Sequence, residues 1–374
     1  MASRNLMPMI APNRAASVAN PEQERLAAVQ AGLVVNGAEP LNCETPVTGL
    51  GGDVTPTARF YRRNHFPIPV LDEAAWRLGI GGMVDRPLSL SLTELTQLPA
   101  ETMVVTLECA GNGRAQFRPP TPGVQWGVGA VSTARWTGAR LADVLERAGI
   151  RRGAREVIFG GADGGTVDGS PRPIRFERSL TVADALESGA LLAYAMNGQP
   201  LPARHGYPVR LVVPGWYAVA SVKWLAHIRV VEAPFEGFFQ AVHYVYERGR
   251  GGTTAAEPVR LHQVRALITR PCSGQQLACG GLVVRGVAWS GAAPIERVEV
   301  SVAGGPWQTA RLVGVAAAHG WQPWEFLATG LEPGEVSIRA RATDLAGQVQ
   351  PEQPEWNRLG YGANFIHEVP LLLR

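Results

Sequence analysis

The chain has 374 residues, of which 46% are hydrophobic and 18% are charged, so it can form a large core and is long enough for about two domains. The formal net charge of +3 is too small to indicate nucleic acid or a membrane surface as the main partner. No stretch approaches the roughly 18 consecutive apolar residues that a transmembrane helix requires, which excludes such a helix.

Residues 1–50 show little pattern beyond one helix predicted at 21–32, and we interpret them as an N-terminal arm. Residues 1–30 contain neither the apolar stretch of a signal peptide nor a twin-arginine pair. The sequence therefore predicts a cytoplasmic protein if Met1 is the native start, or a periplasmic protein if a signal has been removed.

From residue 51 to residue 250 short strands alternate with short helices, which predicts an α+β domain. Ser91 and Glu94 have the spacing of a capping box, and Gly149 suits the end of a helix. Helices are predicted at 92–98, 139–148 and 181–188, and strands at 76–84, 103–108, 156–160, 209–213 and 226–232.

The stretch 247–258 is rich in glycine and has the composition of a linker. After it the pattern changes to the strand period, with Gly/Pro turns and almost no helical pattern. Short strands at this spacing predict an immunoglobulin-like β-sandwich over residues 259–374. The predicted strands are 264–270, 282–289, 295–303, 306–312 and 336–343.

The basic residues are very unevenly divided, because the 35 Lys+Arg comprise one lysine, Lys223, and therefore 34 arginines. A biased codon supply explains the excess of arginine, but a single retained ammonium also suits a position that needs a compact point charge. The four cysteines (43, 109, 272 and 279) show neither CxxC nor zinc spacing. Cys272 and Cys279 could form a disulfide or remain thiols.

The run TLECAGNGR at 106–114 places Cys109 at the end of an apolar strand and before a turn of small residues. Small residues allow a bulky ligand to approach the backbone closely. We expect Arg114 and the backbone N–H groups of the turn to lower the pKa of the thiol, which favours a thiolate that ligates a metal or attacks an electrophile. A buried structural cysteine is the alternative.

Two further runs are rich in cations. RFYRRNHFP at 59–67 is typical of an anion-facing loop, or of a solvated basic turn. In the run at 205–225, His205, Arg210 and Lys223 lie around one predicted strand. Three such donors suit a phosphate or a polar ring system.

Four blocks of the chain resemble the sulfite oxidase family of molybdenum enzymes in their order and spacing. They are RNHFP at 63–67, ECAGN at 108–112, GVQWGVGAVSTARWTG at 123–138 and HGYPVRLVVPGWYAVASVKWL at 205–225. The resemblance covers about residues 45–374. It implies a molybdenum cofactor domain at 51–250 and an immunoglobulin-like dimerisation domain at 259–374, and hence a homodimer. No segment resembles a cytochrome b5 domain and no CxxCH motif is present, which predicts a haem-free bacterial form.

The resemblance also implies roles for individual residues. Cys109 would be the thiolate ligand of molybdenum beside molybdopterin. The residues that would hold the pterin and its phosphate are Asn64, His65, His205, Arg210, Ser221 and Lys223. The residues that would form the substrate pocket are Arg63, Arg114, Tyr244 and, as its wall, Trp126. Arg358, in WNRLG, is the candidate for a further substrate arginine, displaced by one position. Gly113 stands where the animal enzymes carry an arginine.

The implied reaction is oxidation of sulfite to sulfate by oxo transfer from molybdenum(VI), with electrons passed singly to an external acceptor such as cytochrome c. Arginine side chains would bind the oxyanion through charge-assisted hydrogen bonds. Nitrate reductase, or another oxo-transfer oxidoreductase on the same fold, is an alternative. A hydrolase with Cys109 as nucleophile is a more distant one. A non-catalytic adhesion scaffold would leave the cationic runs unexplained.

Overall fold

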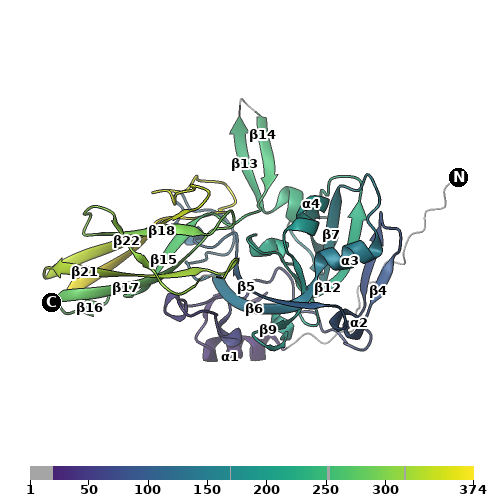
Figure 1. Cartoon of the computed structure of the whole chain (residues 1–374), viewed down its shortest axis with the longest axis horizontal. Helices are drawn as coiled ribbons and strands as arrows, with labels where there is room; N and C mark the ends of the chain where they lie inside the picture. Colours follow the sequence, from purple (N-terminus) through teal and green to yellow (C-terminus); the bar gives the residue numbers. More distant parts are fainter. Residues whose placement is uncertain (1–19, 169, 251–252, 316) are drawn as a thin grey trace.

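The computed structural model describes residues 20–168, 170–250, 253–315 and 317–374. Figure 1 shows two β-rich halves side by side, with a hairpin projecting near their junction. The chain is mostly β with few helices. The first half combines two sheets with short helices, and the second half consists of two packed sheets.

The first half contains two five-stranded sheets. One has the order β4-β3-β12-β7-β8, and in the other β10-β9-β6-β5 form a path with β11 paired to β9. The strands of the first sheet are β3 (Leu78–Gly82), β4 (Leu88–Leu90), β7 (Glu156–Gly165), β8 (Ile174–Thr181) and β12 (Leu225–Val231). Those of the second are β5 (Ala100–Glu108), β6 (Val131–Arg140), β9 (Leu191–Met196), β10 (Gln199–Pro200) and β11 (Arg210–Val212).

The helices of this half are short and end at, or up to two residues before, the predicted position. Ser91 and Glu94 form the predicted capping box, and the Ser91 N–H donates to Glu94 Oε2 at 2.8 Å. Gly149 has φ of 73° at the C-terminus of its helix, a conformation that glycine adopts without strain. The helices are α2 (Leu92–Thr96), α3 (Leu141–Ala148) and α4 (Val182–Glu187).

The second half is a two-sheet sandwich, with the orders β15-β17-β21-β20 and β16-β23-β22-β18-β19. Buried side chains of both sheets form one core, among them Ile268, Trp324 and Ile338. The strands are β15 (Arg265–Arg270), β16 (Gln276–Leu277), β17 (Gly280–Trp289), β18 (Ile295–Val302), β19 (Gln308–Thr309), β20 (Arg311–Leu312), β21 (Gln322–Leu331), β22 (Gly334–Asp344) and β23 (His367–Leu373). The sequence did not predict strands β21 and β23. Each contains a proline, and a proline lowers the expectation of a strand because it cannot donate a backbone hydrogen bond to its neighbour.

The stretch predicted as a linker is instead a hairpin, so that prediction was wrong. Strands β13 (Val245–Arg250) and β14 (Thr253–Pro258) pair antiparallel from Val245↔Pro258 to Arg250↔Thr253. A hairpin ladder is made of backbone hydrogen bonds, so a composition without a strong strand pattern does not exclude it. The short turns are 3₁₀ at Val47–Gly49, Thr57–Arg59, Arg114–Gln116, Ala203–His205 and Ala218–Ala220, and π-helical at Phe238–Val242.

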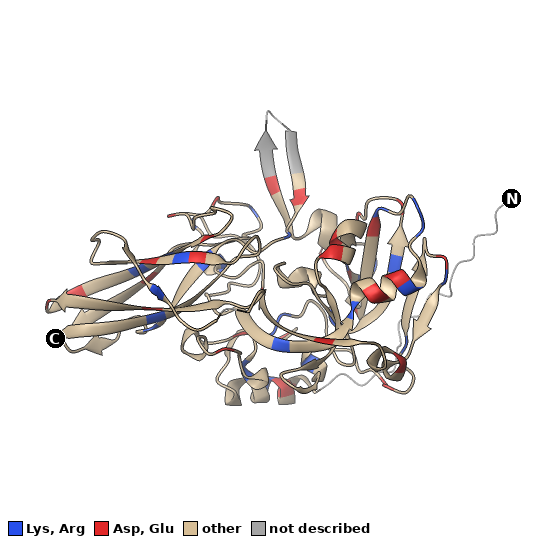
Figure 2. Cartoon of the chain, viewed as in Figure 1, with Lys and Arg blue, Asp and Glu red and all other residues tan. Residues whose placement is uncertain are grey.

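The N-terminal arm lies against the first half. Its described part contains α1 (Pro21–Gln30), β1 (Val34–Gly37) and β2 (Asn42–Glu44), whereas residues 1–19 lie outside the described residues. None of the helices in the described part of the chain is long and apolar enough to cross a membrane. Figure 2 shows basic and acidic residues interspersed over both halves. No face that is basic throughout is visible in this view.

Candidate functional site

Cys109 lies where strand β5 ends, at the junction of the two halves. Its N–H donates to the Ala130 carbonyl at 2.9 Å, and its own carbonyl accepts from the Asn112 N–H at 2.9 Å. The Asn112 side chain accepts from the Ala130 N–H at 3.0 Å, so the turn is tied twice to the next strand. Cys109 is 5% exposed and lines an internal cavity.

The small residues of the turn make room for Arg114 rather than for a ligand. A Cβ added at Gly111 would lie 2.8 Å from Cζ of the Arg114 guanidinium, and one at Gly123 would lie 2.9 Å from its Nη1. Gly111 of the turn and Gly123 thus both leave space that the Arg114 guanidinium occupies.

The cavity beside Cys109 brings together most of the predicted site residues. They come from the loop after β2, from the segment around β11 and from the end of the π-helical turn. The predicted residues that line it are Cys109, Arg63, Asn64, His65, His205, Arg210, Ser221, Lys223 and Tyr244. Segments more than a hundred residues apart thus meet at one place, as the motifs predict.

The single lysine points into this cavity and contacts neutral groups. Its ammonium donates to Asn64 Oδ1 and lies 4.0 Å from the ring centroid of Trp224. Arg63 likewise donates to the Asn64 backbone carbonyl. Burial, and then the nearby Arg210, hold the pKa of Lys223 well below its usual range.

Asp163, at the glycine-rich end of β7, faces Lys223 and was not predicted. It is 5% exposed, and its Oδ1 has no hydrogen-bond partner within the described residues. Burial raises its pKa to about 7, although Lys223 acts in the opposite direction. The available signal was a lone carboxylate inside GGADGG at 160–165, directly after a predicted strand.

Cations crowd the other side of the cavity. Burial, and then Arg204 and Lys223, hold the pKa of His205 well below its usual range. Arg210 donates to the carbonyls of His205 at 3.1 Å and Ser221 at 3.0 Å, and burial lowers its pKa to about 10. The Ser221 hydroxyl accepts from the Val213 N–H at 3.0 Å. The Ser221 hydroxyl therefore shapes the loop, while the Ser221 backbone carbonyl accepts from Arg210.

Tyr244 and His65 form a pair inside the cavity. His65 Nε2 lies 2.7 Å from the Tyr244 hydroxyl, and its ring stacks on Phe176 at 4.9 Å. Tyr244 has φ of 58°, a left-handed conformation that a bulky residue rarely adopts and that often marks a functional site. Burial raises the pKa of Tyr244, whereas burial and Arg63 lower that of His65 well below its usual range. Near neutral pH the phenol is therefore protonated and the imidazole is neutral.

The thiol of Cys109 does not have the low pKa that the sequence suggested. Burial raises the pKa of the thiol, and this effect exceeds the lowering by Arg63, Arg114 and the Gly111 N–H. The cations therefore act as predicted, but desolvation of the thiolate is the larger effect. A bound cation at the sulfur would supply the missing stabilisation.

Arg114 and Trp126 lie behind the cavity rather than in its wall. Arg114 donates to the Leu359 carbonyl from Nε at 3.2 Å and from Nη2 at 3.0 Å, and to the Val124 carbonyl at 3.1 Å. Trp126 is fully buried in the cluster that also contains Cys109. Arg114 is thus a fixed positive charge beside the cavity, held by a backbone carbonyl of the second half.

Arg358 does not join the site, which corrects its predicted role. Its guanidinium pairs with the carboxylate of Glu247, with Nε at 2.9 Å from Oε2, and its side chain is 58% exposed. The neighbouring Leu359 carbonyl faces Arg114 instead. Arg358 and Leu359 lie in a turn that is closed by a hydrogen bond from the Gly360 N–H to the Asn357 carbonyl at 2.9 Å.

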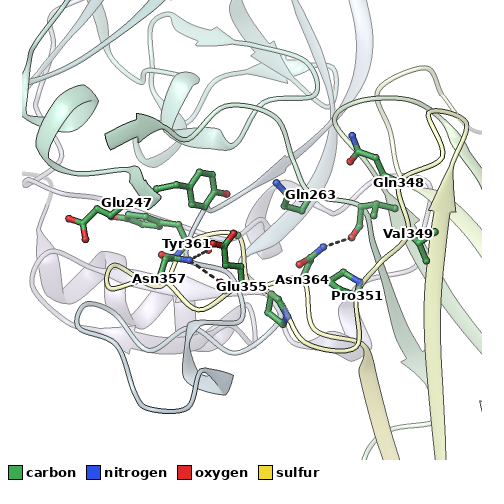
Figure 3. A pocket seen from close by; sticks show the side chains of 13 residues that line it. Glu247, Gln263, Gln348, Val349, Pro351, Glu355, Asn357, Tyr361 and Asn364 are labelled. Atoms are coloured by element: carbon green, nitrogen blue, oxygen red, sulfur yellow. Dashed lines mark hydrogen bonds between the residues drawn. The ribbon is translucent and has the colours of Figure 1, made fainter. Parts of the chain in front are cut away.

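Tyr361, which was not predicted, separates this cavity from a second one. Its ring stacks on Tyr244 with centroids 4.8 Å apart, and it also lines a cavity of about 330 Å³ between the two halves (Figure 3). The outer cavity is lined by carboxylates and amides, including Glu247, Gln263 and Asn357. The only sequence signal was its position in WNRLGYG, three residues after Arg358.

The inner cavity has the donors that a metal cofactor with an anionic tail requires. In the described part of the chain no three His, Cys, Asp or Glu side chains cluster as a metal site, so Cys109 would be one ligand and the cofactor would supply the others. A soft thiolate suits molybdenum bound by a dithiolene. Arg210, Lys223 and His205 suit a phosphate, and the unpartnered Asp163 Oδ1 suits a ring N–H donor.

Two family models match most of the chain. Residues 65–239 match the oxidoreductase molybdopterin binding domain, and residues 258–373 match the Mo-co oxidoreductase dimerisation domain. The first match covers His65, Cys109, Asp163, His205 and Lys223. Arg63 and Asn64 lie just before its start.

Known proteins resemble the chain over nearly its whole length. The sulfite oxidase of Gallus gallus is 39% identical over 88% of this chain and 75% of that protein, and that of Arabidopsis thaliana is 33% identical over 91% and 94%. The chain spans 65% of the length of the mitochondrial sulfite oxidase of Rattus norvegicus. The crystal structure of the sulfane dehydrogenase SoxCD from Paracoccus pantotrophus matches with a TM-score of 0.76 and 27% identity, over 88% of this chain and 83% of that chain. The chain belongs to the sulfite oxidase family.

Proposed function

We propose that the protein oxidises sulfite to sulfate with molybdenum bound to molybdopterin. The observation that carries this proposal is the cavity in which Cys109, Arg63 and Tyr244 meet, with more buried cations than buried carboxylates around it. The similarity to sulfite oxidases and to the molybdopterin binding domain supports it.

The cofactor would be held by residues from three segments. Cys109 would bind the metal, Arg210, His205 and Lys223 the phosphate, and Asp163 a donor of the pterin ring. When bound, the molybdenum centre supplies oxygen-atom transfer and a two-electron redox change. Lys223 and Arg63 now donate to oxygens of Asn64, which are neutral acceptors. An anionic group in the cavity would be a stronger acceptor for both cations.

The side chains around Cys109 are suited to bind and orient a small oxyanion. Arg63 has donors at the cavity. Burial lowers its pKa, but the combined opposing effect of Tyr244, Cys109 and Tyr361 is larger, so the pKa is raised overall. Tyr244 keeps a proton on its Oη, which lies 2.7 Å from His65 Nε2. Arg114 adds a fixed positive charge without contacting the cavity. Charges fixed in a site from which water is excluded stabilise an anion more strongly than mobile ones.

The second half would serve as a dimerisation domain of immunoglobulin-like topology, from about residue 259 to residue 374. The packing of its two sheets and the match to the dimerisation domain support this. Light scattering on the full chain at micromolar concentration tests it, and a monomeric mass would contradict it. Electrons would pass to an external acceptor such as a c-type cytochrome.

The test is metal analysis combined with substrate-driven spectroscopy of the intact protein. We expect molybdenum to copurify, and sulfite to bleach a thiolate-to-molybdenum absorption band that Cys109→Ser lacks. Bleaching by a sulfane compound but not by sulfite would instead assign a sulfane dehydrogenase, like the structurally similar SoxCD. Nitrate-driven reoxidation without a response to sulfite would assign a nitrate reductase. Hydrolysis that is blocked by thiol alkylation, with no molybdenum, would overturn the proposal.

A further inference from the structure

A buried ion pair joins the two halves of the molecule directly beside Cys109. Arg265, the first residue of β15, donates from Nη1 to Glu108 Oε1 at 3.2 Å. Glu108 is the last residue of β5 and precedes Cys109 in the chain. The two side chains are only 2% and 3% exposed.

The rest of the Glu108 carboxyl group is also bonded. Trp289, at the end of β17, donates from Nε1 to Oε2 at 2.9 Å, and the Asn112 side chain donates to Oε1 at 2.9 Å. Arg265 Nη1 further donates to the Asn112 backbone carbonyl at 3.3 Å. One guanidinium therefore connects both ends of the turn 108–112, between which Cys109 lies.

The guanidinium fits against the turn because Gly113 has no side chain. Gly113 has φ of 88°, and a Cβ placed there would lie 3.2 Å from Arg265 Nη2 and 2.9 Å from the Ala363 carbonyl. On the same side the Gly362 N–H donates to the Ala110 carbonyl at 2.8 Å. The turn is thus enclosed by groups of the second half at Glu108, Ala110 and Asn112.

We propose that Arg265 is a positioning residue that sets the conformation of the Cys109 turn. Trp289 assists it as the neutral donor to the same Glu108 carboxyl group. The second half is then part of the site's geometry, in addition to any role in assembly. Positioning of reacting groups is sensitive to shifts of about 1 Å, which can cost on the order of a hundredfold in rate. The inference rests on the proposed function only in taking Cys109 as the metal ligand.

The experiment compares Arg265→Gln with Arg341→Gln in the full-length, cofactor-loaded protein. Arg341 pairs with Glu299 at 2.9 Å within the second half and is partly buried, so it controls for loss of an ion pair away from the turn. We expect Arg265→Gln to shift the thiolate-to-molybdenum band and to lower kcat at least tenfold. KM for sulfite should change less than about threefold, because Arg63 and Tyr244 are untouched. Arg341→Gln should leave the band and kcat unchanged.

A second variant separates positioning from folding. Removing Arg265 alone leaves a buried carboxyl group without its charged partner, which destabilises a protein strongly. The double variant Glu108→Gln, Arg265→Gln removes that imbalance, and Arg265→Lys keeps the charge without the fork. We expect the double variant to fold and still show the shifted band, with hydrogen exchange of peptide 106–116 at least tenfold faster in cofactor-free protein. Arg265→Lys should restore part of both readouts.

Each outcome decides the proposal. A wild-type band, kcat and exchange rate in the double variant, with only a lower unfolding temperature, would overturn it and leave Arg265 as a structural ion pair. If the wild type binds no molybdenum, the proposed function fails. The exchange of peptide 106–116 in the cofactor-free protein then still shows whether Arg265 holds the turn.

Discussion

Buried charges occupy two neighbouring regions of this molecule, and the two regions are arranged in opposite ways. At the junction of the halves, Glu108 receives hydrogen bonds from Arg265, Trp289 and Asn112, so the charges are matched. In the cavity beside Cys109, Arg63 and Lys223 donate to neutral oxygens of Asn42 and Asn64, and Asp163 Oδ1 has no partner in the described residues.

The difference separates a structural role from a binding role. Removing an ion from water costs several kcal/mol even after relaxation, and this cost is offset only when partners replace the water. Although Arg265 Nε has no hydrogen-bond partner in the described residues, at the junction the protein itself supplies partners for both oxygens of Glu108, which is typical of a rigid support. In the cavity it does not, which is typical of a site whose ligand carries the opposite charge. Shifted pKa values alone would not distinguish the two, because burial raises the pKa of Glu108 at the junction and that of Asp163 in the cavity.

The largest expected effect is that of Cys109→Ser, which should abolish sulfite turnover and leave the fold intact. Serine is close in size to the 5% exposed cysteine, but its hydroxyl is a hard donor that does not replace a soft thiolate. The measurement is turnover together with the unfolding temperature. Turnover at the wild-type rate in the purified variant would contradict both the ligand assignment and the binding role of the cavity.

Lys223→Arg should lower turnover by about a hundredfold although the charge is kept. The ammonium fits between Asn64 Oδ1 and the Trp224 ring, and a planar guanidinium is wider and donates in fixed directions. Molybdenum occupancy and turnover are measured beside Arg151→Lys, whose side chain is 55% exposed in a surface pair with Asp85. Full occupancy and turnover in both variants would show that the lysine has no special role in the cavity.

Asp163→Asn should change how stability depends on pH in the cofactor-free protein. The folded state raises the pKa of Asp163 from 3.8 to about 7, so between these values the folded state binds more protons than the unfolded state. The free energy of unfolding therefore falls as pH rises through this window, by on the order of 2–4 kcal/mol. Denaturant unfolding from pH 4 to pH 8 should show a smaller fall in Asp163→Asn. If the free energy of unfolding depended on pH equally in both proteins, the carboxyl group of Asp163 would be paired in the fold, and the cavity would not differ from the junction.

Trp289→Phe should have the smallest effect, a loss of about 1–3 kcal/mol in the free energy of unfolding. It removes the donor to the buried Glu108 Oε2, whereas Arg265 and Asn112 still donate to Oε1. Denaturant unfolding checks the value. Trp321→Phe is the control, since that indole packs in the same hydrophobic cluster as Trp289 but donates to the Gly52 carbonyl and not to Glu108. A loss several times larger in Trp289→Phe alone would mean that the indole, rather than the ion pair, holds the junction.

Short-range features of the site could be predicted from the sequence, whereas its long-range partners could not. The strand that ends at Cys109, the small residues after it and the lone Lys223 are local patterns with local physical causes. Asp163, Tyr361 and Arg265 carry no such pattern, because each is recognised only by what it faces across the fold. Arg358 was assigned by motif position, but its side chain lies in an exposed pair with Glu247.

The sequence by itself determined the capping box of α2, the end of α3 before Gly149 and the residue types that can bind a metal and an anion. These depend on side-chain spacing and chemistry within a few residues. Only the tertiary structure decided which charges meet a partner, that Arg114 is held by the Leu359 carbonyl, and that the pKa of Cys109 is raised and not lowered. The physical reason is that desolvation and pairing depend on the whole surroundings of a group, which the chain assembles from residues as far as 269 positions apart.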